Sequence, residues 1–186
     1  MTSAEPAFRK VHVIQGGHFV TDDANVVLTT VLGSCVAACL RDPLAGVGGM
    51  NHFLLGESRD GAGSADGDMI RYGAYAMEVL INGLMARGAS RNRLEAKLFG
   101  GARMLGGLSD IGAANARFAR KFLADEGIPL LGESLGGDAA RRLEFWPVSG
   151  RVRQRLVSVQ EVEQKPARAP AAPAPAAADG GDLELF

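Results

Sequence analysis

Short runs of β-branched and apolar residues, separated by turn formers, dominate the first third of the chain. Val and Ile in such runs favour strands, because their branched side chains suit a pleated, half-buried surface. The runs predicted to be strands are residues 11–14, 26–31, 35–40 and 47–55. Residues 15–25 are rich in turn formers and are predicted to be irregular. The sequence RDPLAG predicts a turn between the last two runs, which then form a hairpin.

Helical periodicity appears in two central segments. Apolar residues recur at helical spacing from 76 to 84, and Gly88 is placed to end that helix. A second helix is expected to be capped by Ser109 or Asp110 and to end at Gly127. Further strands are expected at residues 94–99, 128–135, 143–148 and 152–159. Many strands around two central helices predict an α+β fold rather than a doubly wound one.

The two ends of the chain differ in composition from its middle. Residues 1–7 are expected to be a flexible N-terminus and residues 8–164 one folded domain. Every residue from Pro166 to Ala178 is Pro or Ala except Arg168, a composition that favours an extended, solvated segment. Residues 165–186 are therefore expected to be a disordered tail. Its last residues, DGGDLELF, are either a frayed end or a docking peptide held on a spacer.

The amino-acid composition argues against several classes of protein. The chain is 47% hydrophobic with a formal net charge of −1, which fits a globular protein and argues against a broadly basic nucleic-acid binder. It has no apolar run of about 18 residues, so no membrane span is predicted, and its first ten residues show no signal peptide. Two cysteines are too few for a disulfide framework, and a reducing, cytoplasmic compartment is expected.

Common cofactor and metal motifs are absent from the sequence. It contains no GxxxxGK[ST] loop and no GxGxxG. The two cysteines lie at a C-x3-C spacing with only three histidines elsewhere, whereas a zinc site needs four closely paired ligands. No metal and no organic cofactor are therefore predicted.

A cysteine and a histidine on neighbouring predicted strands could perform nucleophilic catalysis. Cys35 follows Gly33 and Ser34 at the end of one strand, and His52 lies seventeen residues further on. An imidazole that takes the thiol proton lowers the cysteine pKa from about 8.5 toward neutrality. A third group bonded to the other ring nitrogen would fix the tautomer. The alternative is that Cys35 is a small buried hydrophobe, as is predicted for Cys39.

The stretch LTTVLGSCVAACLRDPLAGVGGMNHFLL, residues 28–55, resembles the signature of the chemoreceptor glutamine deamidase family, CheD. The matching positions there are Thr29, Gly33, Ser34, Cys35, Asp42, Pro43, Gly48, Gly49, Met50 and His52. Three shorter matches follow in the family's order: KLFGGA at residues 97–102, Ile111 and Gly112 with Asn115, and Gly136 and Gly137 with Arg141 and Arg142. The resemblance covers residues 11–159.

The resemblance implies both an activity and a fold. The activity is hydrolysis of glutamine side-chain amides in the cytoplasmic helices of methyl-accepting chemotaxis receptors, through a thioester on a cysteine. Cys35 is then the nucleophile, His52 the general base and later the acid, and Thr29 the residue that orients His52. The implied fold has mixed β-sheets packed as a sandwich with two main helices flanking. It is similar to the deamidase domain of cytotoxic necrotizing factors.

The assignment of Thr29 requires a bend in the chain. Six residues of unbroken strand span about 20 Å, so Thr29 and Cys35 can converge only if the chain turns at Gly33 and Ser34. Thr30 points to the opposite face of the strand and is the weaker candidate.

The resemblance also implies partners. They are the receptor helices as substrate and a CheC-type phosphatase of the response regulator, with no nucleic acid and membrane proximity only through the receptor. One alternative function is a non-enzymatic binding partner that stimulates this phosphatase. Another is a related thiol hydrolase, such as a receptor methylesterase or a cysteine peptidase.

Overall fold

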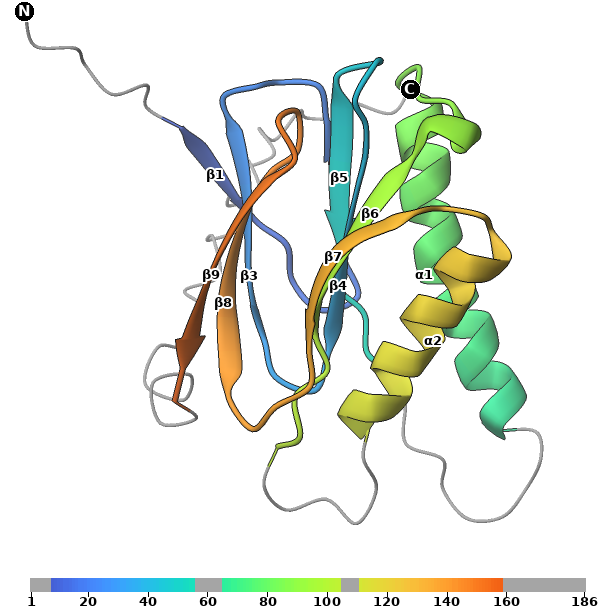
Figure 1. Cartoon of the computed structure of the whole chain (residues 1–186), viewed down its shortest axis with the longest axis vertical. Helices are drawn as coiled ribbons and strands as arrows, with labels where there is room; N and C mark the ends of the chain where they lie inside the picture. Colours follow the sequence, from blue (N-terminus) through green and yellow to red (C-terminus); the bar gives the residue numbers. More distant parts are fainter. Residues whose placement is uncertain (1–7, 56–64, 105–110, 159–186) are drawn as a thin grey trace, which may run out of the picture.

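Two β-sheets and two helices form three layers in the computed structural model of the chain (Figure 1). The structure describes residues 8–55, 65–104 and 111–158. The predictions for residues 1–7, for the tail 165–186, and for a helix cap at Ser109 or Asp110 lie outside these ranges.

The first sheet has the strand order β1-β3-β8-β9. Its strands are β1 (Arg9–His12), β3 (Val26–Leu32), β8 (Ala140–Trp146) and β9 (Arg151–Val157). β1 runs parallel to β3, and the other neighbours are antiparallel. The expected hairpin through Ser149 and Gly150 is confirmed, and Gly150 has the positive φ of 72° that such a tight turn favours.

The second sheet has the order β2-β5-β4-β6-β7. Its strands are β2 (His18–Thr21), β5 (Val47–Asn51), β4 (Val36–Asp42), β6 (Glu95–Gly100) and β7 (Leu130–Leu135). β4 and β5 form the predicted hairpin, while β6 and β7 are parallel. Both sheets are therefore mixed, and the α+β class is confirmed.

Both main helices cover the same face of the second sheet. α1 (Ala65–Met85) packs on β2 and β5, and α2 (Ile111–Asp125) packs on β4 and β6 (Figure 1). A short 3-10 helix, η1 (Arg91–Arg93), joins α1 to β6. Gly88, with a φ of 93°, follows α1 as expected for a residue that ends a helix.

The central strand β4 is buried on both faces, which explains its continuous apolar sequence VAACL. Val36, Ala38 and Leu40 face the helices, whereas Ala37 and Cys39 face the first sheet. Two hydrophobic cores result, one between helices and sheet and one between the two sheets.

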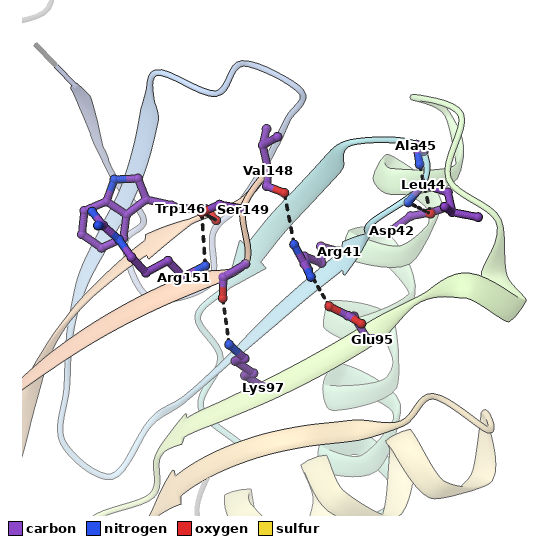
Figure 2. A network of polar contacts seen from close by, with 11 residues as sticks. Arg41, Asp42, Leu44, Ala45, Glu95, Lys97, Trp146, Val148, Ser149 and Arg151 are labelled. Atoms are coloured by element: carbon purple, nitrogen blue, oxygen red, sulfur yellow. Dashed lines mark hydrogen bonds and ion pairs between the residues drawn. The ribbon is translucent and has the colours of Figure 1, made fainter. Parts of the chain in front are cut away.

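Polar contacts tie the two sheets together at one end (Figure 2). Arg41 of β4 bonds to Glu95 of β6 and donates to the carbonyl of Val148 in the β8–β9 turn. Lys97 of β6 donates to the carbonyl of Gly150 in the same turn at 2.8 Å. These bonds fix the stacking of the sheets at the end that holds this turn.

Two segments have a different secondary structure from the one predicted. Residues 15–25 contain a strand, β2, because pairing with β5 compensates for the weak strand propensity of this segment. Residues 65–68 belong to α1, although the sequence suggested a loop as far as residue 68. β1 also begins two residues earlier than predicted, at Arg9.

Candidate active site

Cys35 lies in the connection between β3 and β4, where the chain turns from the first sheet into the second. Three donors hold the carbonyls of this connection. The Ala102 N–H binds Gly33 O at 2.9 Å, Asn115 Nδ2 binds Ser34 O at 2.8 Å, and the Gly101 N–H binds Cys35 O at 2.7 Å. The expected bend at Gly33 and Ser34 is thus present and is fixed from α2 and from the end of β6.

Gly100 lets the end of β6 approach Cys35 closely. Its φ is 114°, and a Cβ at this position would lie 2.1 Å from Cys35 O. The FGGA sequence therefore borders the site, and its two glycines allow the backbone contact that positions the cysteine.

His52 follows β5 and lies on the same face of the second sheet as Cys35. Val36 and Phe53 form an antiparallel bridge, with Val36 N–H to Phe53 O at 3.0 Å and Phe53 N–H to Val36 O at 2.9 Å. Side chains alternate along strands, so Cys35 and His52 are diagonal neighbours facing the first sheet. This cross-strand relation places the predicted nucleophile and base on the same face of the sheet.

The hydrogen bonds of His52 identify its tautomer. Thr30 Oγ1 donates its proton to Val13 O at 2.8 Å and lies 2.9 Å from His52 Nδ1. Val13 O is also 3.4 Å from the same nitrogen. With the Thr30 hydroxyl proton directed at Val13 O, both neighbours of Nδ1 accept, and this arrangement assigns the proton of the neutral ring to Nδ1. Nε2 is then unprotonated, and it is buried with no hydrogen-bond partner among the described residues.

The structure places Thr30, not Thr29, beside His52. Thr29 Oγ1 contacts His12 Nδ1 at 3.4 Å and Val11 O at 3.5 Å, on the outer side of the first sheet. The expectation that Thr29 orients His52 is therefore not met. Thr30 shares its face with the buried Leu28 and Leu32, and this alternation in the sequence could have identified it.

Burial keeps both partners of the pair neutral. It raises the pKa of the Cys35 thiol, a shift that the cysteine's own backbone N–H partly opposes. It lowers the pKa of His52, while the hydrogen bond to Val13 acts in the opposite direction. The resting site therefore holds a thiol and a neutral imidazole rather than an ion pair.

A further residue that the sequence did not single out touches the predicted nucleophile, Cys35. Cys35 Sγ donates to Gln15 Oε1 at 3.3 Å. Gln15 lies in the turn between β1 and β2, in the segment predicted to be irregular, and no motif marked it.

The remaining candidates do not join the site. Cys39 is 2% exposed in the core between the sheets, and burial raises its thiol pKa far above the ordinary value. In the described ranges, no group of three or more His, Cys, Asp or Glu residues could hold a metal ion. Over the same residues, no helix is long and apolar enough to cross a membrane.

Fold and site together define an α+β protein with a cysteine and a basic histidine nitrogen on one face of a sheet, a class suited to thiol-dependent acyl chemistry. Residues 54–156 match the family model described as CheD chemotactic sensory transduction. The chain belongs to the CheD family. The matched range begins after His52, and the matches to whole relatives extend over the site as well.

Curated relatives match nearly the whole chain. A protein of Caulobacter vibrioides (strain NA1000 / CB15N) is 64% identical over 177 residues, covering 95% of this chain and 93% of the relative. One of Agrobacterium fabrum is 54% identical over 186 residues, covering 98% and 99%. Both are named probable chemoreceptor glutamine deamidase CheD.

Among solved structures, Bacillus licheniformis hypothetical protein YfiH aligns with a TM-score of 0.40 at 15% identity, over 70% of this chain and 60% of that one. A likeness of this size adds nothing to the argument.

Proposed function

We propose that this protein is a chemoreceptor glutamine deamidase, which hydrolyses glutamine side chains of methyl-accepting chemotaxis receptors to glutamate and ammonia. The observation that carries the proposal is the buried Nε2 of His52, which has no hydrogen-bond partner among the described residues and lies on the face that holds Cys35. The curated names of relatives that are 54–64% identical supply the substrate class.

The reaction begins with a proton transfer within the pair. Cys35 Sγ passes its proton to His52 Nε2, and the thiolate attacks the side-chain carbonyl carbon of the substrate glutamine. The Cys35 N–H, already directed toward the sulfur, is a donor for the oxyanion that forms. His52 returns the proton to the departing ammonia, which leaves a thioester on Cys35.

Hydrolysis completes the cycle. His52 Nε2 takes a proton from water, the hydroxide attacks the thioester, and glutamate leaves as Cys35 regains its proton. Thr30 accepts the hydrogen bond from Nδ1–H throughout and stabilises the imidazolium. No step requires a metal or an organic cofactor.

The setting of this activity is also part of the proposal. The substrate is the cytoplasmic helices of receptors, so the protein acts in the cytoplasm and meets the membrane only through them. A CheC-type phosphatase as a partner, and a fold similar to cytotoxic necrotizing factor deamidase domains, are predictions from the family resemblance.

Intact-mass analysis of a purified receptor cytoplasmic fragment tests the activity. Conversion of one glutamine to glutamate adds about 1 Da, and peptide mapping locates the change. We expect conversion by the wild type and by Cys39→Ala, a matched loss of a buried thiol, and none by Cys35→Ala. Conversion by Cys35→Ala would remove the proposed nucleophile. Turnover of glutamate methyl esters without any deamidation would replace the proposal with a methylesterase.

A further inference from the structure

The side chain of Gln15, which is hydrogen-bonded to Cys35, carries a primary carboxamide, the same functional group as the proposed substrate. Cys35 Sγ donates to the amide oxygen of Gln15 at 3.3 Å. A substrate glutamine must bring its own primary carboxamide to this sulfur. The chain therefore holds an internal carboxamide at the atom where the reaction begins.

The turn that carries Gln15 is fixed to the backbone of His52. Gly17 N–H bonds to Ile14 O at 2.9 Å, and Gly16 has a φ of 81°, so Gln15 occupies the second position of a type II turn. Gly16 N–H bonds to His52 O at 2.7 Å, and His52 N–H bonds to Gly17 O at 3.0 Å. The turn that carries the Gln15 side chain is thus held in place beside His52.

The bond to Gln15 keeps the thiol proton away from the base. Cys35 directs its S–H toward Gln15 Oε1, and His52 Nε2 has no partner among the residues that the structure describes. A hydrogen bond donated by the neutral thiol favours that neutral form. Transfer to Nε2 requires the S–H to leave Gln15.

We propose that the Gln15 side chain occupies, in the resting protein, the subsite that receives the substrate's primary carboxamide, and that substrate binding displaces it. This inference rests on the proposed function for the identity of the substrate. The displacement exchanges one carboxamide for another at the thiol. It disturbs no core packing, because Gln15 is exposed.

The geometry gives the subsite its boundaries. On one side lies Cys35 Sγ, which bonds to the Gln15 carboxamide, and on the other lies the turn of residues 14–17, which is bonded to the backbone of His52. An arriving carboxamide that takes over the position of Gln15 brings its carbonyl next to the sulfur.

The test measures the reactivity of the thiol and needs no receptor. Wild type, Gln15→Ala and Gln15→Glu are treated with methyl methanethiosulfonate at pH 7, and labelling of Cys35 is followed by mass spectrometry. Gln154→Ala is the matched control, since Gln154 lies on β9 and bonds to Ser134. We expect Gln15→Ala to react roughly fivefold faster, the effect of losing one hydrogen bond. Gln15→Glu should react more slowly than wild type, because a carboxylate beside the sulfur opposes the thiolate.

A small carboxamide added in solution distinguishes occupancy of the subsite from simple shielding of the thiol by the Gln15 side chain. Acetamide, a free primary carboxamide, should slow the labelling of Gln15→Ala toward the wild-type rate, whereas acetate at the same concentration should not. With the receptor fragment, Gln15→Ala should lower KM severalfold without lowering kcat.

Several results would overturn the inference. They are equal labelling rates for wild type and Gln15→Ala, no response of Gln15→Ala to acetamide, or a tenfold loss of kcat in that variant. The last result would make Gln15 a residue that catalysis needs. Failure of the proposed function is a separate result, because the labelling and acetamide responses would stand while no receptor glutamine was converted.

Discussion

At the scale of single residues, two adjacent threonines on β3 have different contacts, although the sequence analysis expected Thr29 to orient His52. Thr30 is 1% exposed and bonds to His52, whereas Thr29 is half-buried and contacts His12. Adjacent side chains of a strand point to opposite faces, so only one of the two can reach the space between the sheets.

Replacing these threonines separates their contributions. Thr30→Val removes the acceptor of the His52 Nδ1–H bond, and we expect kcat/KM for deamidation to fall about tenfold, since one lost hydrogen bond costs roughly 1.4 kcal/mol. Thr30→Ser keeps the hydroxyl and should restore most of the activity. Thr29→Val should stay within about twofold of wild type. A larger loss in Thr29→Val than in Thr30→Val would reverse the assignment.

Motif spacing in the sequence identifies which residues are candidates for the site. The pairing of Cys35 with His52 was predicted, and the Val36–Phe53 bridge places both on one face. Motif spacing does not say which strand face a residue occupies, which is why Thr29 was expected in place of Thr30. Gln15 belongs to no motif and reaches the thiol only through the fold.

At the scale of elements, one carboxylate joins three pieces of the fold. Asp42, at the end of β4, is fully buried. It accepts hydrogen bonds from the N–H groups of Leu44 and Ala45 in the following turn, from Ser90, and from Arg93 of η1. Burial acts to raise the pKa of Asp42, but these donors outweigh it and hold the pKa well below its usual range.

Substitution of Asp42 should loosen this junction. Asp42→Asn puts an NH2 group opposite N–H donors, and we expect the free energy of unfolding to fall by about 2–4 kcal/mol. The control Asp68→Asn removes an exposed ion pair with Arg71 and should cost about 0.5 kcal/mol or less. Urea unfolding followed by circular dichroism measures both. Equal losses in the two variants would show that the junction contributes little.

Gly100, the last residue of β6, lies against the backbone of Cys35. In Gly100→Ala the new methyl group would meet Cys35 O, so we expect at least about 2 kcal/mol of lost stability and a displaced Cys35. Gly127→Ala is the matched control, because Gly127 also has a positive φ but has open space around it. It should cost about 1 kcal/mol and leave deamidation unchanged. Full activity in Gly100→Ala would contradict the importance of this contact.

The elements themselves were largely predictable, and the errors share a cause. Long apolar runs such as β4 and periodic segments such as α2 can be recognised from their own sequence pattern. The sequence of β2 has no such pattern, because its four residues become a strand only by pairing with β5. Likewise, no local pattern shows that both helices cover the same sheet.

At the scale of the whole molecule, buried titrating groups make stability depend on pH. The pKa of His52 lies below its ordinary 6.5 in the folded protein, so the unfolded chain binds this proton more readily. The contribution of His52 to the free energy of unfolding is present above about pH 6.5 and is lost as the pH falls through the pKa of His52 in the folded protein. Asp42 adds a second loss in the same direction, below its ordinary 3.8.

We therefore expect the urea midpoint to decrease on acidification from pH 7.5 to pH 5, before the carboxylates titrate. In His52→Asn, which lacks the titrating ring, the decrease should be smaller. A midpoint that stays constant over this interval in the wild type would contradict the burial of a neutral imidazole.

The covered, neutral thiol also determines how the protein withstands oxidants. Peroxide attacks the thiolate, and oxidation beyond sulfenic acid is irreversible for most cysteines. Cys35 is 9% exposed and directs its S–H to Gln15, so the resting protein offers little of the species that peroxide consumes. In the proposed mechanism the thiolate forms when a substrate has entered, and the substrate then covers the sulfur. The vulnerable state of the nucleophile is thereby confined to the time it spends in catalysis, and an idle enzyme can outlast an oxidative episode in working order.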